Sequence, residues 1–60
     1  MQWWRTRDGE LINLTLVETI ETPDRTIRFY YPRGSSTLDV YPTVEARDYA
    51  YSRLKAKLDV

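Results

Sequence analysis

The chain contains no cysteine and no histidine. Without cysteine it can form neither a disulfide nor a thiolate metal site, and without histidine it lacks the commonest metal ligand and general base. An enzyme also needs a nucleophile with a base beside it, and the carboxylates of this chain form no pair at a spacing that suggests acid–base chemistry. We therefore expect a protein that is not an enzyme, with no catalytic residue, no metal site and no cofactor.

An excess of charge of one sign is missing too. Nine basic and nine acidic residues cancel, so the chain has no overall field that would attract nucleic acid or an anionic membrane. No apolar run is long enough to cross a membrane, and the N-terminal sequence MQWWR is not that of a signal peptide. These absences favour a cytoplasmic protein with no membrane partner and no small-molecule substrate, and they disfavour nucleic acid as a partner without excluding it.

The length of 60 residues allows one domain, residues 1–60, with a small core. Domains of this size usually depend on disulfides, a metal or self-association for their stability. What the chain offers instead is aromatic side chains, with two tryptophans, five tyrosines and one phenylalanine. Aromatic packing within a monomer and self-association therefore both remain as sources of its stability.

The first half of the chain has the pattern of short strands joined by turns. Asp8-Gly9 predicts a hairpin, because glycine accepts the positive φ that a type I′ turn requires. Between residues 10 and 22 the apolar residues alternate, but Val17 and Glu18 break the alternation. One strand with a bulge and two separate strands both remain open, and we favour two strands at about residues 10–14 and 16–22.

Two more strands follow, separated by turns at Pro23-Asp24 and at residues 32–35. Alternation assigns each side chain of these strands to one face of the sheet. The side chains expected to face the core are Ile27, Phe29, Leu38 and Val40. The side chains expected to face outward are Arg28, Tyr30, Asp39 and Tyr41.

The last third of the chain predicts an amphipathic helix over residues 44–58. Thr43 is placed to cap its first turn, and Glu45 and Lys57 complement the helix dipole at its two ends. An apolar stripe at helical spacing is formed by Val44, Ala50, Tyr51, Leu54 and Leu58. Together these elements predict an α+β fold, an antiparallel meander of four to five strands with one C-terminal helix packed on one face.

One helix covers one face of a sheet, so the other face is the candidate binding surface. Its expected residues are Trp3, Arg5, Arg7, Arg28, Tyr30 and Tyr41. Adjacent strand residues point to opposite faces, so only one of Trp3 and Trp4 can lie in the core. Aromatic and arginine side chains on an open sheet suit a protein interface, and they also suit stacking on nucleic acid bases. They can equally serve the sheet itself, through cross-strand pairs.

The segment DGELINL at residues 8–14 and the helix start TVEA at residues 43–46 resemble a pattern of short uncharacterised bacterial and phage proteins. Those proteins carry a DG-x-L-x-N-L motif, then two strands, then a T-x-E-A helix start. The resemblance covers most of the chain. It implies the same order of elements and no known activity.

The order of several strands followed by one helix is also similar to the single-stranded-DNA-binding transcriptional coactivators. That resemblance implies a dimer formed through the helix and a sheet that grips single strands. Trp3, Arg5, Arg28 and Tyr30 would then hold the nucleic acid. The chain departs from that family because it lacks lysine-rich strands.

From these observations we expect a small protein-binding module that acts through the outer face of its sheet, with a homodimer as one form. The alternative is a single-stranded nucleic-acid-binding protein.

Overall fold

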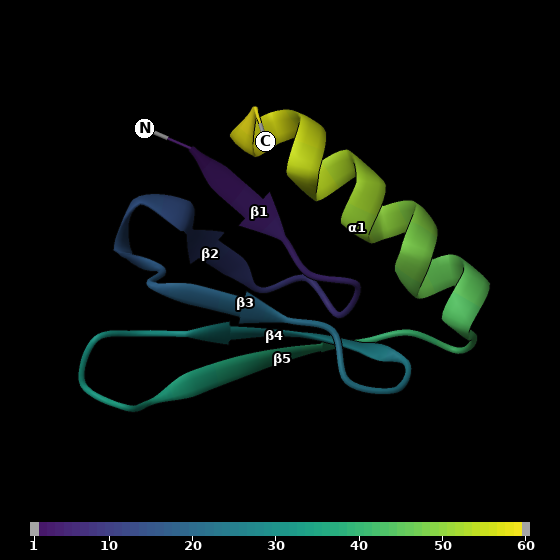
Figure 1. The fold of residues 1–60 in the computed structure, drawn as a ribbon, viewed down its shortest axis with the longest axis horizontal. Coiled ribbons are helices and arrows are strands. Elements are labelled where there is room, and N and C mark those ends of the chain that lie inside the picture. The colour runs from purple at the N-terminus through teal and green to yellow at the C-terminus, as the bar shows by residue number, and fades with distance from the viewer. Residues whose placement is uncertain (1, 60) are drawn as a thin grey trace.

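The computed structural model describes residues 2–59, and in them the predicted α+β class is confirmed (Figure 1). Five antiparallel strands precede one helix, α1 (Val44–Leu58), whose bounds agree with the sequence prediction. The strands are β1 (Trp3–Arg5), β2 (Leu11–Asn13), β3 (Thr19–Glu21), β4 (Thr26–Tyr30) and β5 (Ser36–Val40). They follow one another as in a meander, but they form two sheets, β1–β2 and β3–β4–β5. The helix packs across β4.

The β1–β2 hairpin turns at Asp8-Gly9, as expected. Gly9 has a φ of +97°, which confirms the predicted positive φ. The loop is one residue longer than the type I′ turn we expected, because Thr6 N–H donates to the carbonyl of Glu10 at 2.8 Å and closes a loop of residues 7–9. Thr6 is buried, and its hydroxyl accepts from the N–H of Glu10 at 2.9 Å.

A short 3₁₀ helix, η1 (Leu14–Leu16), separates β2 from β3. The carboxamide oxygen of Asn13 accepts from the N–H of Thr15 at 3.0 Å and caps this turn. Residues 10–22 are therefore two strands with a turn between them, as predicted, and the turn carries the chain from the first sheet to the second.

In β5 the predicted faces are reversed. Leu38 and Val40 are 41% and 54% exposed, whereas Asp39 is 1% exposed and Tyr41 is buried. The register explains this result, since Asp39 lies opposite Ile27 of β4, and directly opposed residues share a face of the sheet. Asp39 can occupy the inner face because its carboxylate accepts three hydrogen bonds from other parts of the chain.

The core lies between the three-stranded sheet, the hairpin and the helix. Phe29 and Leu54 are fully buried in it, as predicted. Its buried apolar members are Trp4, Ile12, Leu14, Ile27, Phe29, Tyr41, Ala50 and Leu54. The hydroxyl of Thr43 caps the helix as expected, accepting from the N–H of Ala46 at 3.1 Å.

The apolar stripe predicted on the helix is wrong at its first residue. Val44 is exposed, and the buried residues of α1, Ala50 and Leu54, lie further along the helix. The first turn of the helix lies at the end of the sheet (Figure 1). Within residues 2–59, no helix is both long enough and apolar enough to cross a membrane.

Candidate functional site

The six residues predicted for the binding surface do not share one face. Arg28 and Tyr30 lie on the outer face of the three-stranded sheet, and Trp3 and Arg5 lie on the exposed side of the separate β1–β2 hairpin. Arg7 lies in the turn after β1, where it is exposed. Tyr41 is buried, so its assignment to an outer face is wrong. Of the adjacent tryptophans, Trp4 lies in the core and Trp3 is exposed, which confirms that only one of them can be buried.

The outer face of the three-stranded sheet carries a small polar network. The Arg28 guanidinium donates to the hydroxyl of Tyr30 at 3.1 Å, and that hydroxyl donates to the carboxylate of Glu21 at 3.0 Å. The Arg28 guanidinium also lies 5.9 Å from the centre of the Tyr30 ring. The hydrogen bond to Tyr30 raises the pKa of Arg28, so its charge is held on this face. The network braces the strands and leaves Leu38 and Val40 exposed beside it.

Strand β5 is an edge of its sheet, with β4 on one side. Tyr31 N–H donates to Ser35 O at 2.9 Å, and Tyr41 N–H donates to Arg25 O at 2.8 Å. Because hydrogen-bonded positions alternate along an antiparallel ladder, Ser35, Thr37, Asp39 and Tyr41 face β4, and the backbone groups of Ser36, Leu38 and Val40 point to the open side. A hollow of about 310 Å³ lies along this edge, lined by the charged residues Arg7, Asp8 and Arg25 and by Leu38, Val40, Tyr41 and Pro42.

The carboxylate of Asp39 is the centre of a buried polar cluster. It accepts from the indole N–H of Trp4 at 3.0 Å, from the hydroxyl of Tyr41 at 2.5 Å and from the backbone N–H of Arg7 at 2.8 Å. Three donors offset the cost of removing a carboxylate from water. Burial, and then the hydrogen bond to Asp39, raise the pKa of Tyr41 well above its usual range, so Tyr41 stays a donor. The cluster joins the hairpin to β5.

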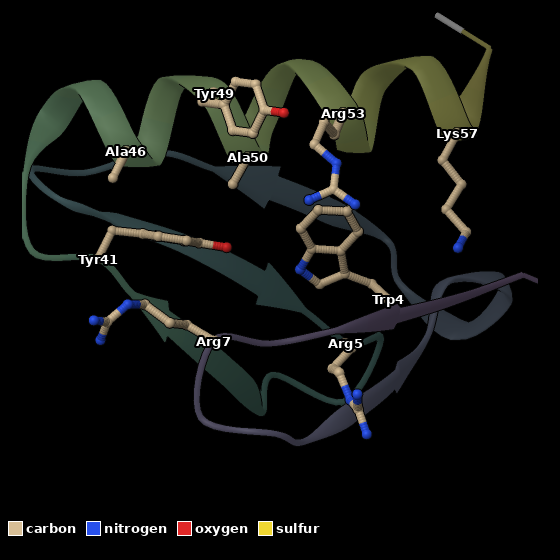
Figure 2. A pocket seen from close by; sticks show the side chains of 9 residues that line it. All are labelled: Trp4, Arg5, Arg7, Tyr41, Ala46, Tyr49, Ala50, Arg53 and Lys57. Carbon is tan, nitrogen blue, oxygen red and sulfur yellow. The ribbon is translucent and has the colours of Figure 1, made fainter.

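Above this cluster lies a cleft of about 440 Å³ between the hairpin and α1. Figure 2 shows that Arg53 and Lys57 extend from the helix toward β1, with the Arg53 guanidinium next to the indole of Trp4. Arg5 also lines the cleft, but its guanidinium points away from the helix (Figure 2). The remaining lining residues are Arg7, Tyr41, Ala46, Tyr49 and Ala50.

The cleft is positively charged although the chain as a whole is neutral. Arg7, Arg53 and Lys57 form no ion pair with any of residues 2–59, and no aspartate or glutamate lines the cleft. Arg7 and Arg53 are close enough to Tyr41 to lower its pKa, against the larger effects of burial and of Asp39. At one end of the cleft Gln2 donates to the carbonyl of Lys57 at 2.9 Å, which ties the start of β1 to the end of the helix.

Three of the predicted site residues, Arg5, Arg7 and Tyr41, line this cleft. Trp4, Tyr49, Arg53 and Lys57 line it too, although they were not predicted as site residues. A signal for three of these was present in the sequence. Tyr49, Arg53 and Lys57 are spaced four residues apart, so they form one row on the surface of the helix. What the sequence could not show is that this row faces the hairpin.

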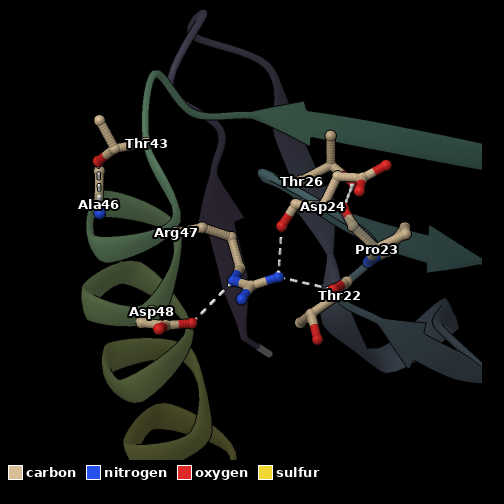
Figure 3. Close-up of polar contacts among 8 residues, drawn as sticks. All are labelled: Thr22, Pro23, Asp24, Thr26, Thr43, Ala46, Arg47 and Asp48. Atoms are coloured by element: carbon tan, nitrogen blue, oxygen red, sulfur yellow. Dashed lines mark hydrogen bonds and ion pairs between the residues drawn. The ribbon is translucent and has the colours of Figure 1, made fainter.

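Arg47 is the most constrained charged side chain of the helix, and its role is structural (Figure 3). Its guanidinium donates to the carbonyls of Thr22 and Asp24 at 2.6 Å each, and it pairs with the carboxylate of Asp48 at 2.8 Å. These contacts hold the first half of the helix against the β3–β4 turn. They use its Nε donor within the helix and its Nη1 donors to join the helix to the rest of the chain.

Residues 2–59 contain no group of three aspartates or glutamates arranged to hold a metal ion. Comparison with protein-family models, with curated proteins and with solved structures gave no match to this chain. The motif resemblances described from the sequence therefore stay predictions.

Proposed function

We propose that this chain is a small, non-enzymatic protein-binding module that acts through its three-stranded sheet, and that the protein it binds is a second copy of itself. The observation that carries this proposal is the open edge of β5. Unpaired backbone groups lie there beside two apolar side chains, Leu38 and Val40, that are 41% and 54% exposed. The absence of histidine and cysteine from the sequence supports a non-enzymatic role.

Edge strands of stable monomers are usually protected by charged side chains, proline or a covering loop. Strand β5, with the sequence STLDV, has no proline, and its one charged side chain, Asp39, is turned into the core. An edge without such protection is a template for pairing with another strand.

A second copy fits this edge because the strand is self-complementary. In a twofold antiparallel pair centred on Leu38, each Leu38 lies opposite its counterpart, and each Ser36 lies opposite Val40 of the second copy. The outward backbone groups of these three residues then form the ladder, and the leucines and valines make one apolar strip across the joined sheets. Burial of these side chains supplies the driving force that a 60-residue domain needs from self-association.

The test is the mass of the protein in solution, measured by light scattering and by sedimentation over a range of concentrations. We expect the wild-type chain, with a mass of 7.2 kDa, to reach twice that mass as its concentration rises. Val40→Lys places a charge on the paired edge and should give a monomer with an unchanged far-UV spectrum, because Val40 is exposed in the folded chain.

Thr19→Lys is the matched control. Thr19 is an exposed residue of β3, on the opposite edge of the same sheet, and it shares the outer face with Tyr30. It should leave the dimer intact. A wild-type chain that stays at the monomer mass at the highest concentration, or a Val40→Lys variant that still dimerises, would show that the β5 edge is not the interface.

A further inference from the structure

The cleft between β1 and α1 is a second candidate surface, and it meets the hollow along the β5 edge at Arg7 and Tyr41. Three cations line it, Arg7 from the hairpin and Arg53 and Lys57 from the helix. The acidic groups beside them are Asp39, which is hydrogen-bonded to Tyr41, and Asp8, which lines the adjoining hollow with Arg7. Three positive charges against these two negative charges leave a positive surplus. A cleft lined by one sign of charge focuses its field and concentrates counter-ions of the other sign.

The cations are placed to contact more than one anionic group. Arg53 and Lys57 are four residues apart, so their Cα atoms are separated by about 6 Å along the helix axis. Arg7 lies across the cleft beside Tyr41. Because none of the three is paired with a carboxylate within residues 2–59, their donors are available without breaking an existing ion pair.

Aromatic side chains accompany the cations. Tyr49 is 69% exposed at the rim of the cleft, and the guanidinium of Arg53 lies 6.0 Å from the centre of its ring. The indole of Trp4 forms part of the floor, beneath Arg53 (Figure 2). An exposed aromatic ring next to a row of cations is the arrangement on which bases stack while their phosphates are held.

We propose that this cleft binds single-stranded nucleic acid, with phosphates held by Arg7, Arg53 and Lys57 and a base stacked on Tyr49. The volume of about 440 Å³ is in the range of clefts that hold one small ligand, so it suits a single nucleotide of a strand. The neutral charge of the whole chain does not oppose this binding, because no aspartate or glutamate lines the cleft itself. Arg7 and Tyr41 also line the hollow along the β5 edge, so the cleft adjoins the dimer interface proposed above at these two residues.

The experiment measures the binding of a fluorescently labelled oligothymidylate of about 12 nucleotides as a function of salt concentration. Wild-type protein should bind at low salt and lose affinity as salt is raised, with each neutralised phosphate contributing about 0.7 to the slope of log K against log salt. Arg53→Gln with Lys57→Gln should lower that slope by about 1.4. Tyr49→Ala should weaken binding about tenfold through lost stacking and leave the melting temperature unchanged, since this ring is exposed.

Lys55→Gln is the matched control for charge. Lys55 lies on the same helix, but it does not line the cleft, and its amine lies 5.0 Å from the centre of the Tyr51 ring. Its replacement should change the slope by much less than the double variant does. Wild-type protein diluted to the concentration at which it is a monomer should still bind the oligonucleotide, which separates this proposal from the dimer.

Three results would overturn the proposal. The first is no binding of the oligonucleotide at low salt. The second is an equal loss of affinity in Lys55→Gln and in the cleft variants, which would make the binding a general effect of charge. The third is binding of duplex DNA or of thymidine monophosphate as tight as that of the single strand, which would remove the strand as the ligand.

Discussion

Strands β4 and β5 lie side by side in one sheet, and they bury opposite kinds of side chain. In β4 the apolar residues Ile27 and Phe29 are fully buried and Arg28 and Tyr30 face outward. In β5 the acidic residue Asp39 is buried and the apolar residues Leu38 and Val40 are exposed. In both strands successive side chains point to opposite faces of the sheet. Strand geometry alone therefore does not decide which set of side chains faces the core.

The difference shows what decides the choice. For β4, burial of Ile27 and Phe29 against the helix is favourable and has no competing demand. For β5, turning Leu38 and Val40 inward would gain apolar burial, but it would leave the indole of Trp4 and the N–H of Arg7 without their common acceptor. A satisfied buried carboxylate is retained because removing it leaves several donors unpaired.

The largest expected effect tests the apolar side of this comparison. Phe29→Ala removes a fully buried ring from the contact between β4 and the helix and should cost about 3–5 kcal/mol of unfolding free energy. For a 60-residue domain that cost should leave the chain largely unfolded at room temperature. The measurement is urea denaturation followed by circular dichroism. A variant that unfolds cooperatively at nearly the same urea concentration as the parent would contradict the core described here.

The next effect tests the polar side. Asp39→Ala leaves two buried donors and one part-buried donor without an acceptor and should cost about 3 kcal/mol. Asp39→Asn keeps one carbonyl oxygen and should cost less. Glu21→Ala, on the outer face, is the control for losing an acidic side chain and should cost under about 1 kcal/mol. Equal stabilities for Asp39→Ala and Glu21→Ala would show that the buried cluster contributes no more than a surface pair.

A smaller effect is expected from alkaline pH. The pKa of Tyr41 is raised in the folded chain, so above about pH 10 the unfolded chain releases this proton while the folded chain keeps it. The contribution of Tyr41 to the free energy of unfolding is therefore fully present below about pH 10. Above that pH it falls by up to about 1.4 kcal/mol per pH unit. The melting temperature of wild type should decline more steeply over this range than that of Tyr41→Phe. Parallel declines would contradict the raised pKa.

The smallest effect is expected at the exposed positions of β5. Leu38→Thr keeps a β-compatible residue on the outer face and should change the stability of the monomer by less than about 0.5 kcal/mol. The measurement needs a dilute sample, so that self-association does not contribute to the melt. A loss of more than about 2 kcal/mol would show that Leu38 belongs to the core after all.

Part of this structure was predictable because it depends on nearby residues. The bounds of α1 follow from the cap at Thr43 and the helical spacing beyond it, and the conformation of Gly9 follows from the hairpin it closes. The break between β2 and β3 follows from the failure of alternation at Val17 and Glu18. Each of these features is decided by hydrogen bonds and steric limits within a few residues.

The candidate surfaces depend on residues far apart in the sequence. The carboxylate of Asp39 accepts hydrogen bonds from Trp4 and Arg7, which lie 35 and 32 residues away in the sequence. Local pattern carries no information about such partners, so it assigned Asp39 and Tyr41 to the wrong face. The same limit applies to the cleft, because the row of Tyr49, Arg53 and Lys57 was readable but its position opposite the hairpin was not.

The sequence by itself therefore determined the class of the fold, the order of its elements, the helix with its cap and the burial of Phe29 and Leu54. Only the tertiary structure decided that the strands divide into two sheets, that β5 turns its acid inward and that Arg7, Arg53 and Lys57 line one cleft with Trp4. The physical reason is that turns and caps are set by local geometry, whereas a buried charge and a charged cleft depend on which distant donors and charges the fold brings together.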